Sequence, residues 1–211
     1  MSTKSKTKLY GRRTKEHPYS KAVPYAAYIF IISLYLVSSP PKIMLLTLLF
    51  SALHEAAHII CAKALGREVS PWRFSFFGLC PDTSSGSALS TLFIYASGPA
   101  VNLAVSLVSI AVMRGGGSDT LLYVFSINAL LFVYNIIPVP FSDGDGIMRT
   151  VLSFFLSSTL VKYICAVLNV IFSTAVFSLF SYRFLFLGSG LFSFFCSFIF
   201  LFSSFERLLK G

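Results

Sequence analysis

The sequence contains few charged residues, which excludes an ordinary soluble protein. Asp, Glu, Lys and Arg make up 12% of the 211 residues, whereas hydrophobic residues make up 55%. Soluble domains have a charged share of about 25%. Long stretches carry no ionisable side chain, and a helical membrane span needs about 20 mostly apolar residues. The composition therefore predicts an integral membrane protein.

The apolar stretches predict an all-α membrane protein with six transmembrane helices. Little polar sequence remains for a soluble domain. We divide the chain into a basic cytosolic arm at 1–21, a core at 22–146 with the first four spans, and a C-terminal part at 147–211. This last part contains an interfacial helix at 147–160 and two further spans. The predicted spans are 22–39, 43–65, 89–113, 120–140, 163–182 and 184–205.

Cysteine is also scarce, and its placement implies no disulfide framework. The four cysteines lie in or beside predicted spans and have no metal-like spacing. We expect them to serve as packing residues. They are Cys61, Cys80, Cys165 and Cys196.

Basic residues predict the orientation of the chain, whose net charge is +9. Short cytosolic loops carry an excess of Lys and Arg. With a cytosolic N-terminus, only Lys42, Arg114 and Arg183 among the 17 Lys and Arg residues fall outside. We therefore predict a multi-pass protein of the cell membrane, with both termini and the active site on the cytosolic side. The arm is expected to contact anionic lipids and not nucleic acid.

Two of the three histidines lie in the second predicted span, in the sequence His-Glu-Ala-Ala-His at 54–58. Each ionisable group in a span costs a few kcal/mol (about 2.5 to 3.5) on insertion scales, so a cluster indicates function. His54 and His58 share one helix face and can bind one zinc ion. Glu55 projects beside them and can act as the general base. Histidines that merely satisfy each other are the alternative, but the spacing around Glu55 favours catalysis.

A catalytic zinc ion generally needs a third protein ligand, and acidic residues are scarce. Only Asp143 and Asp145 follow a span that ends at the same membrane face as the histidines. The residues alone do not decide which of the two is the third ligand. Pro138 and Pro140 are expected to end that span. Unwound backbone at this depth is tolerated where it lines a watery cavity, which hydrolysis requires.

The order of these motifs resembles the site-2 protease family of intramembrane zinc metalloproteases. In that family a His-Glu-x-x-His helix is followed two spans later by Asn-x-x-Pro and Asp-Gly, which Asn135, Pro138 and Asp143 match. The segment at 98–102 in the third span is similar to the family's Gly-Pro-x-x-Asn element. The resemblance covers residue 22 to about residue 149, and it makes the core a three-motif metalloprotease unit.

The resemblance implies a single catalytic Zn²⁺ with Asp143 as its third ligand. Asp145 stands where similar relatives often have glycine, so it remains an alternative ligand. Polar residues in the third and fourth spans are implied to shape the site or to hold the substrate backbone, with interhelical hydrogen bonding as the alternative for the asparagines. These residues are Asn102, Asn135 and Pro138.

Residues 70–79 alternate between aromatic and polar residues, with Trp72, Phe74 and Phe76 on one side. Such alternation is typical of a strand. The resemblance implies a short re-entrant strand or hairpin after the second span, which can bind an extended substrate by strand addition. An aromatic interfacial loop is the alternative.

The resemblance also implies an endopeptidase acting in regulated intramembrane proteolysis. The compact form is closest to the bacterial sporulation branch, which matures a membrane-tethered sigma-factor precursor. A tethered regulator of this kind is the expected substrate, and a regulatory membrane protein is a further expected partner. A metal-ion transporter is the main alternative, but the motif is not repeated and Glu55 has no role in transport. A catalytically idle chaperone-like relative is disfavoured because all chemical groups are present.

Overall fold

The computed structural model describes residues 33, 35, 39–67, 74–75, 78–79, 87–116 and 118–210. Five helices within these residues have the length and apolar composition of membrane spans. The chain is therefore a multi-pass helical membrane protein. The basic arm and nearly all of the predicted first span lie outside the described residues, so the count of six spans stays a prediction.

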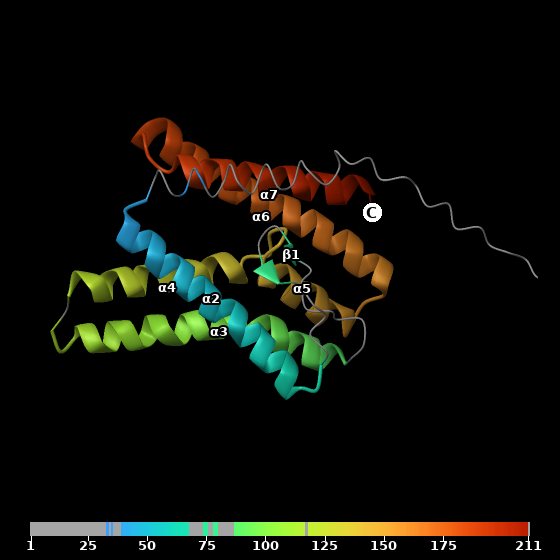
Figure 1. Cartoon of the computed structure of the whole chain (residues 1–211). Coiled ribbons are helices and arrows are strands. Elements are labelled where there is room, and N and C mark those ends of the chain that lie inside the picture. The colour runs from blue at the N-terminus through green and yellow to red at the C-terminus, as the bar shows by residue number, and fades with distance from the viewer. Residues whose placement is uncertain are drawn as a thin grey trace, which may run out of the picture.

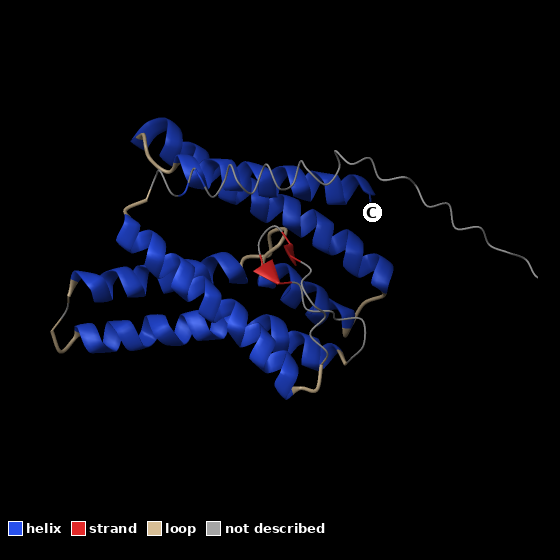
Figure 2. Cartoon of the chain, viewed as in Figure 1, coloured by secondary structure: helices blue, strands red, loops and turns tan. Residues whose placement is uncertain are grey.

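Six helices and two short strands follow one another in the described residues (Figures 1 and 2). In chain order they are α2 Pro41–Ala64, β1 Phe74–Ser75, β2 Gly78–Leu79, α3 Ala88–Met113, α4 Asp119–Ile136, α5 Asp143–Ser153, α6 Ser158–Leu187 and α7 Leu191–Lys210. The five helices other than α5 are long enough to span a membrane.

Local sequence explains where the helices begin. Ser87, Ser118 and Ser142 directly precede α3, α4 and α5, and each side chain accepts a hydrogen bond from the backbone N–H three residues later. A serine in this position satisfies one of the N–H groups that the first helical turn leaves unpaired. Helix α2 begins at Pro41, whose fixed φ suits the first helical position.

The boundaries around the fourth predicted span differ from expectation. Helix α4 ends at Ile136 rather than at residue 140, because Ile137 precedes a proline and has an extended backbone with ψ of 127°. The interfacial helix expected at 147–160 is α5, which begins four residues earlier and ends at Ser153. Its cap, Ser142, starts the helix at Asp143, so that residue lies in a helical turn and not in unwound backbone.

The break between the last two spans also lies elsewhere than predicted. Arg183 is part of α6, which continues to Leu187. Gly188 then adopts the left-handed conformation with φ of 60°. Glycine takes this conformation without a steric penalty and commonly ends helices. The break between the two helices therefore lies at Gly188 and not at Arg183.

A small antiparallel strand pair lies between α2 and α3, within the segment whose alternation predicts a strand. Phe74 pairs with Leu79, and Ser75 pairs with Gly78. Figure 2 draws the pair in red. Re-entry of this segment into the membrane stays a prediction.

The helices form two groups that α5 connects (Figure 1). Helices α2, α3 and α4 pack against one another, and α6 packs against α7. Helix α5 contacts α3 and α4 on one side and α6 on the other. Among the described residues, α5 thus provides the main backbone contact between the two groups.

Many of the buried side chains are polar, whereas many large apolar side chains are exposed. Such a distribution suits a protein that is surrounded by lipid, where small and polar side chains join the helices. Among the described residues, the fully buried polar side chains are Asn102, Asn128, Asn169, Ser173, Ser197 and Ser204. Two of them, Asn102 and Asn128, belong to the site described next.

Candidate metal centre

Helix α2 brings two imidazoles to one point. His54 and His58 are four residues apart, so they lie on one face a single turn apart. Their Nε2 atoms are 3.1 Å apart, and the residues are only 5% and 4% exposed. The sequence prediction that both histidines face the same position is confirmed by this geometry.

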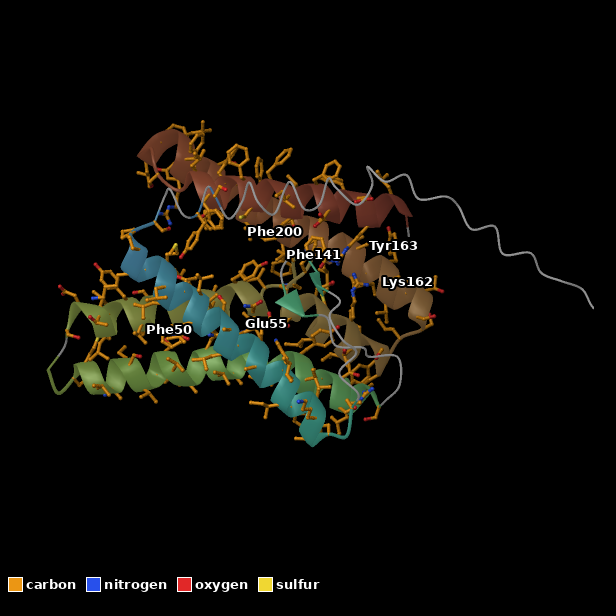
Figure 3. All side chains as sticks on the ribbon, in the orientation of Figure 1. Phe50, Glu55, Phe141, Lys162, Tyr163 and Phe200 are labelled. Carbon is orange, nitrogen blue, oxygen red and sulfur yellow. The ribbon has the colours of Figure 1, made fainter. Side chains whose placement is uncertain are left out.

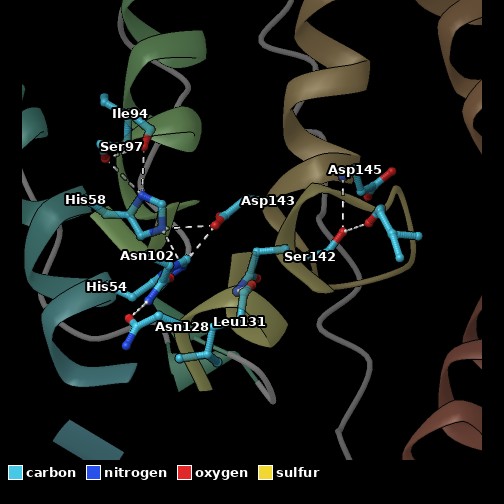
Figure 4. A network of polar contacts seen from close by, with 12 residues as sticks. His54, His58, Ile94, Ser97, Asn102, Asn128, Leu131, Ser142, Asp143 and Asp145 are labelled. Atoms are coloured by element: carbon cyan, nitrogen blue, oxygen red, sulfur yellow. Dashed lines mark hydrogen bonds and ion pairs between the residues drawn. The ribbon is translucent and has the colours of Figure 1, made fainter. Parts of the chain in front are cut away.

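A chain of amides fixes the orientation of His54 (Figure 4). Asn128 Nδ2 donates to the backbone oxygen of Val124 at 2.8 Å, so its Oδ1 faces Asn102 and accepts from Asn102 Nδ2 at 3.0 Å. Asn102 Oδ1 therefore faces His54 Nδ1, at 2.5 Å. Since an amide oxygen only accepts, Nδ1 carries the proton of the neutral ring. His54 Nε2 is then an unprotonated acceptor.

His58 is held in the same tautomer by the backbone of α3. Its Nδ1 donates to the carbonyl oxygen of Ile94 at 2.7 Å, and Ser97 Oγ lies 3.3 Å from the same nitrogen. A carbonyl has no proton to give, so His58 Nε2 is likewise an acceptor. Partners of this kind orient metal-binding histidines and set which nitrogen is free.

Asp143 supplies a third acceptor to the same point. Its Oδ2 lies 3.0 Å from His54 Nε2 and 3.2 Å from His58 Nε2. Figure 4 shows the carboxylate facing the two rings from the start of α5. An ionised carboxylate has no proton to donate, so it can only accept.

A tight turn after α4 carries Asp143 back to the histidines. Ser142 Oγ donates to the backbone oxygens of Ile137 and Val139 at 2.7 and 2.9 Å and also caps α5. Phe141 takes a positive φ of 73°, which is uncommon for a residue with a side chain. A Cβ on Gly144 would collide with the backbone oxygen of Ile136, so the turn requires glycine there.

Three acceptors that face one another are arranged to hold a cation between them. The edges of the triangle are 3.1, 3.0 and 3.2 Å, close to the roughly 3.3 Å between two ligands of a tetrahedral ion bound at about 2.05 Å. Asp143 Oδ2 is buried, and none of the described residues donates a hydrogen bond to it. His54, His58 and Asp143 can thus hold a metal ion, and the donor set fits zinc with one open position.

Glu55 and His54 border a cavity of about 370 Å³ beside this centre. Figure 3 labels Glu55 on α2 in the middle of the fold. The other walls come from α4, α6 and α7 and are largely aromatic or aliphatic. Besides Glu55 and His54, the lining residues are Ser51, Leu131, Tyr134, Asn135, Val176, Phe180, Phe192, Ser193, Cys196, Ser197 and Phe200.

The three residues expected to shape the site or hold substrate lie in different surroundings. Asn102 is fully buried, and both its amide atoms are engaged with His54 and Asn128, so its geometry fits the orienting role and not a substrate contact. Asn135 lines the cavity, and its Nδ2 donates to the backbone oxygen of Leu131. Pro138 is not among the described residues that line the cavity, and it lies in the turn before Asp143.

Asp145, the alternative ligand, points away from the metal centre. Its carboxylate lies 3.0 Å from Arg149 Nε and 2.7 Å from Arg207 Nη1. Asn169 Nδ2 donates to the same group at 3.1 Å. Asp143, and not Asp145, is therefore the carboxylate that is positioned to bind a metal ion with the two histidines.

Neither Gly98 nor Asn128 was predicted as a site residue. A Cβ on Gly98 would lie 2.6 Å from His54 Cε1 and Nε2, and closer still to His58 Nε2. Only glycine leaves room for the two rings. The signal for Asn128 in the sequence is a lone amide within an apolar span, which usually marks an interhelical partner. Interhelical hydrogen bonds in membranes average only about 0.6 kcal/mol, so the main effect of Asn128 is the orientation of Asn102.

Replacing Gly98 by alanine is expected to weaken metal binding about tenfold or more, because the methyl group displaces both imidazoles. The same change in a helix ordinarily stabilises it by ~1 kcal/mol, so the fold is expected to survive. Zinc titration of the purified variant measures the effect. Gly115→Ala is the matched control, since its Cβ would meet only the Val112 oxygen at 3.6 Å. Equal zinc affinity in the two variants would contradict the close contact.

Comparisons with known proteins bear on the fold. No family model and no curated protein matches the chain. Among solved structures, the chain is similar to the Site-2 Protease from Methanocaldococcus jannaschii, with a TM-score of 0.62 and 20% sequence identity over 88% of each chain. This likeness concerns the arrangement of the helices. The chain therefore has the fold of a site-2 protease.

Proposed function

We propose that the chain is an intramembrane zinc endopeptidase that hydrolyses a peptide bond of a membrane-embedded or membrane-tethered protein. The observation that carries the proposal is the convergence of two imidazole Nε2 atoms and one carboxylate oxygen on a single point. Glu55 and the cavity lie beside that point. The fold shared with a site-2 protease supports the same function.

The residues of the site divide the chemistry among them. His54, His58 and Asp143 would hold the zinc ion, which would supply Lewis acidity to lower the pKa of a water molecule and to polarise a carbonyl. Glu55 accepts the proton of that water and later transfers it to the nitrogen of the leaving amine. Asn102, oriented by Asn128, keeps the His54 Nε2 lone pair directed at the metal.

The cavity limits the shape of the substrate. A volume of about 370 Å³ holds a few residues of extended chain, whereas a helix with its side chains is about 10–12 Å wide. Peptide bonds in a helix are also shielded by their own hydrogen bonds. A transmembrane substrate must therefore unwind near Glu55, and the β1–β2 pair offers strand edges that an extended segment can join.

The biological setting of this activity rests on analogy with the family. We propose a tethered regulator, such as a sigma-factor precursor, as substrate, with a regulatory membrane protein as partner and a cytosolic active site. The basic arm at 1–21 would contact anionic lipids on the same side.

Metal removal tests the proposal. The protein purified in detergent is expected to contain one zinc ion per chain and to cleave a membrane-tethered reporter. A chelator should abolish cleavage, and added zinc should restore it, because the proposed chemistry depends on the Lewis acidity of the ion. Zinc flux into vesicles without reporter cleavage would instead support the alternative that the chain is a metal-ion transporter. Cleavage that persists after complete zinc removal would overturn the protease mechanism.

A further inference from the structure

Asp145 is the centre of a buried polar cluster that the proposed chemistry does not use. The residue is 7% exposed. Its carboxylate contacts Arg149 in α5, Asn169 in α6 and Arg207 in α7. One side chain thus joins three helices, and its partners in α6 and α7 lie far from it in the sequence.

Asp143 and Asp145 lie on opposite faces of the first turn of α5. Two residues along a helix turn the side chain by about 200°. Asp143 accordingly faces the histidines of α2, and Asp145 faces α6 and α7. A displacement of this turn by its contacts with α7 therefore moves the metal-binding carboxylate as well.

Arg207 contacts the ligand segment on both sides of Asp143. Its Nη1 lies 2.7 Å from Asp145 Oδ2, and its Cζ lies 5.3 Å from the centre of the Phe141 ring. Phe141 is the residue with the positive φ in the turn. The two contacts hold the segment at Phe141 and at Asp145, which lie two residues before and two residues after Asp143.

Helix α7 also forms one wall of the cavity, through residues that include Phe192, Cys196 and Phe200. Its arginine and its cavity-lining residues belong to one rigid helix, so the position of the wall and the position of the ligand segment are linked. The backbone contact between the two helix groups runs mainly through α5 among the described residues.

We propose that Arg207 is a positioning residue, which acts through Asp145 to place Asp143 for metal binding and thereby links the cavity wall to the metal centre. The proposal rests on the proposed zinc site. It assigns a role to the second of the two aspartates, which the proposed chemistry does not use. The charge pair fixes the ligand segment to α7, and loss of either partner loosens the carboxylate without removing a ligand.

A double-mutant cycle on the full-length protein tests the coupling. Zinc affinity of Arg207→Gln, Asp145→Asn and the double variant is measured by competition with a chromophoric chelator. Each single variant is expected to bind zinc about tenfold more weakly, which is typical when an outer partner of a metal site is lost. The double variant should be at most about twofold weaker than Asp145→Asn, because Arg207 acts through that residue.

Cobalt loading and two further variants separate positioning from general stability. The visible spectrum of the cobalt-loaded single variants should shift, since it reports ligand geometry. Arg207→Lys keeps the charge and should recover part of the affinity. Arg183→Gln removes the same charge from an exposed position of α6 and should change neither readout.

The outcomes are distinguishable. Unchanged zinc affinity and cobalt spectrum with lower thermal stability would make the cluster purely structural and overturn the inference. Multiplicative losses in the double variant would also overturn it, because the two residues would then act independently. A wild-type protein that binds no zinc would defeat the proposed function and this inference together, whereas a cleaving, zinc-bound Arg207→Gln with wild-type affinity would defeat the inference alone.

Discussion

Replacing Glu55 by glutamine is expected to reduce reporter cleavage by about 10² to 10⁴-fold while zinc stays bound. Glutamine has nearly the same shape but cannot accept the proton of the attacking water. Glu55 lies outside the group of side chains that converge on the metal, so the ligand set remains whole. The measurement combines cleavage of a membrane-tethered reporter with zinc content of the same preparation.

Asp119→Asn provides the control for this change. Asp119 lies in the first turn of α4, away from the histidines, and the substitution again converts a carboxylate to an amide. It should leave cleavage and zinc content unchanged. Wild-type cleavage by Glu55→Gln would show that another group accepts the proton. Loss of zinc together with cleavage would make Glu55 a ligand and would require a different base.

Replacing Asp143 by asparagine is expected to weaken zinc binding by roughly 100-fold or more, since the change removes a charged ligand rather than an outer partner. Without metal, the amide can donate to a histidine Nε2 that otherwise faces another acceptor. The metal-free variant should therefore melt no lower than the metal-free wild type. The rise in melting temperature that zinc gives the wild type should disappear.

Asp145→Asn is the matched comparison for the second ligand assignment. Its carboxylate is engaged with arginines and not with the histidines, so zinc binding should fall only about tenfold. Zinc titration and thermal melts with and without zinc measure both variants. Stronger zinc binding by Asp143→Asn than by Asp145→Asn would reverse the assignment and make Asp145 the ligand.

The sequence predicts the metal-binding helix well because the signal is local. His54 and His58 are one turn apart, and their meeting depends only on helical geometry. The third ligand is less accessible to such reasoning. The residues alone give no reason to prefer Asp143 or Asp145 as the ligand, and only the resemblance to the site-2 proteases favours Asp143. The structure distinguishes them through partners in α6 and α7, which no local pattern records.

Other features depend on packing and on turn chemistry. The contact of Gly98 with the imidazoles arises only when α3 packs against α2. The sequence predicts that the fifth span ends at residue 182, before the charged Arg183, but α6 continues through that residue to Leu187 and stops at Gly188, which has a positive φ. The orienting role of Asn102 depends on its second partner, Asn128, which lies on a third helix.

The distance along the chain between the ligands has a consequence for biogenesis. The imidazoles belong to α2, whereas the carboxylate begins α5 and is steadied by the final helix. During synthesis the histidines reach the membrane first and lack the third ligand until α4 and α5 have followed. A nascent chain that has not yet added α5 therefore lacks one of the three side chains of the candidate metal centre, and the proposed protease would be inactive at that stage.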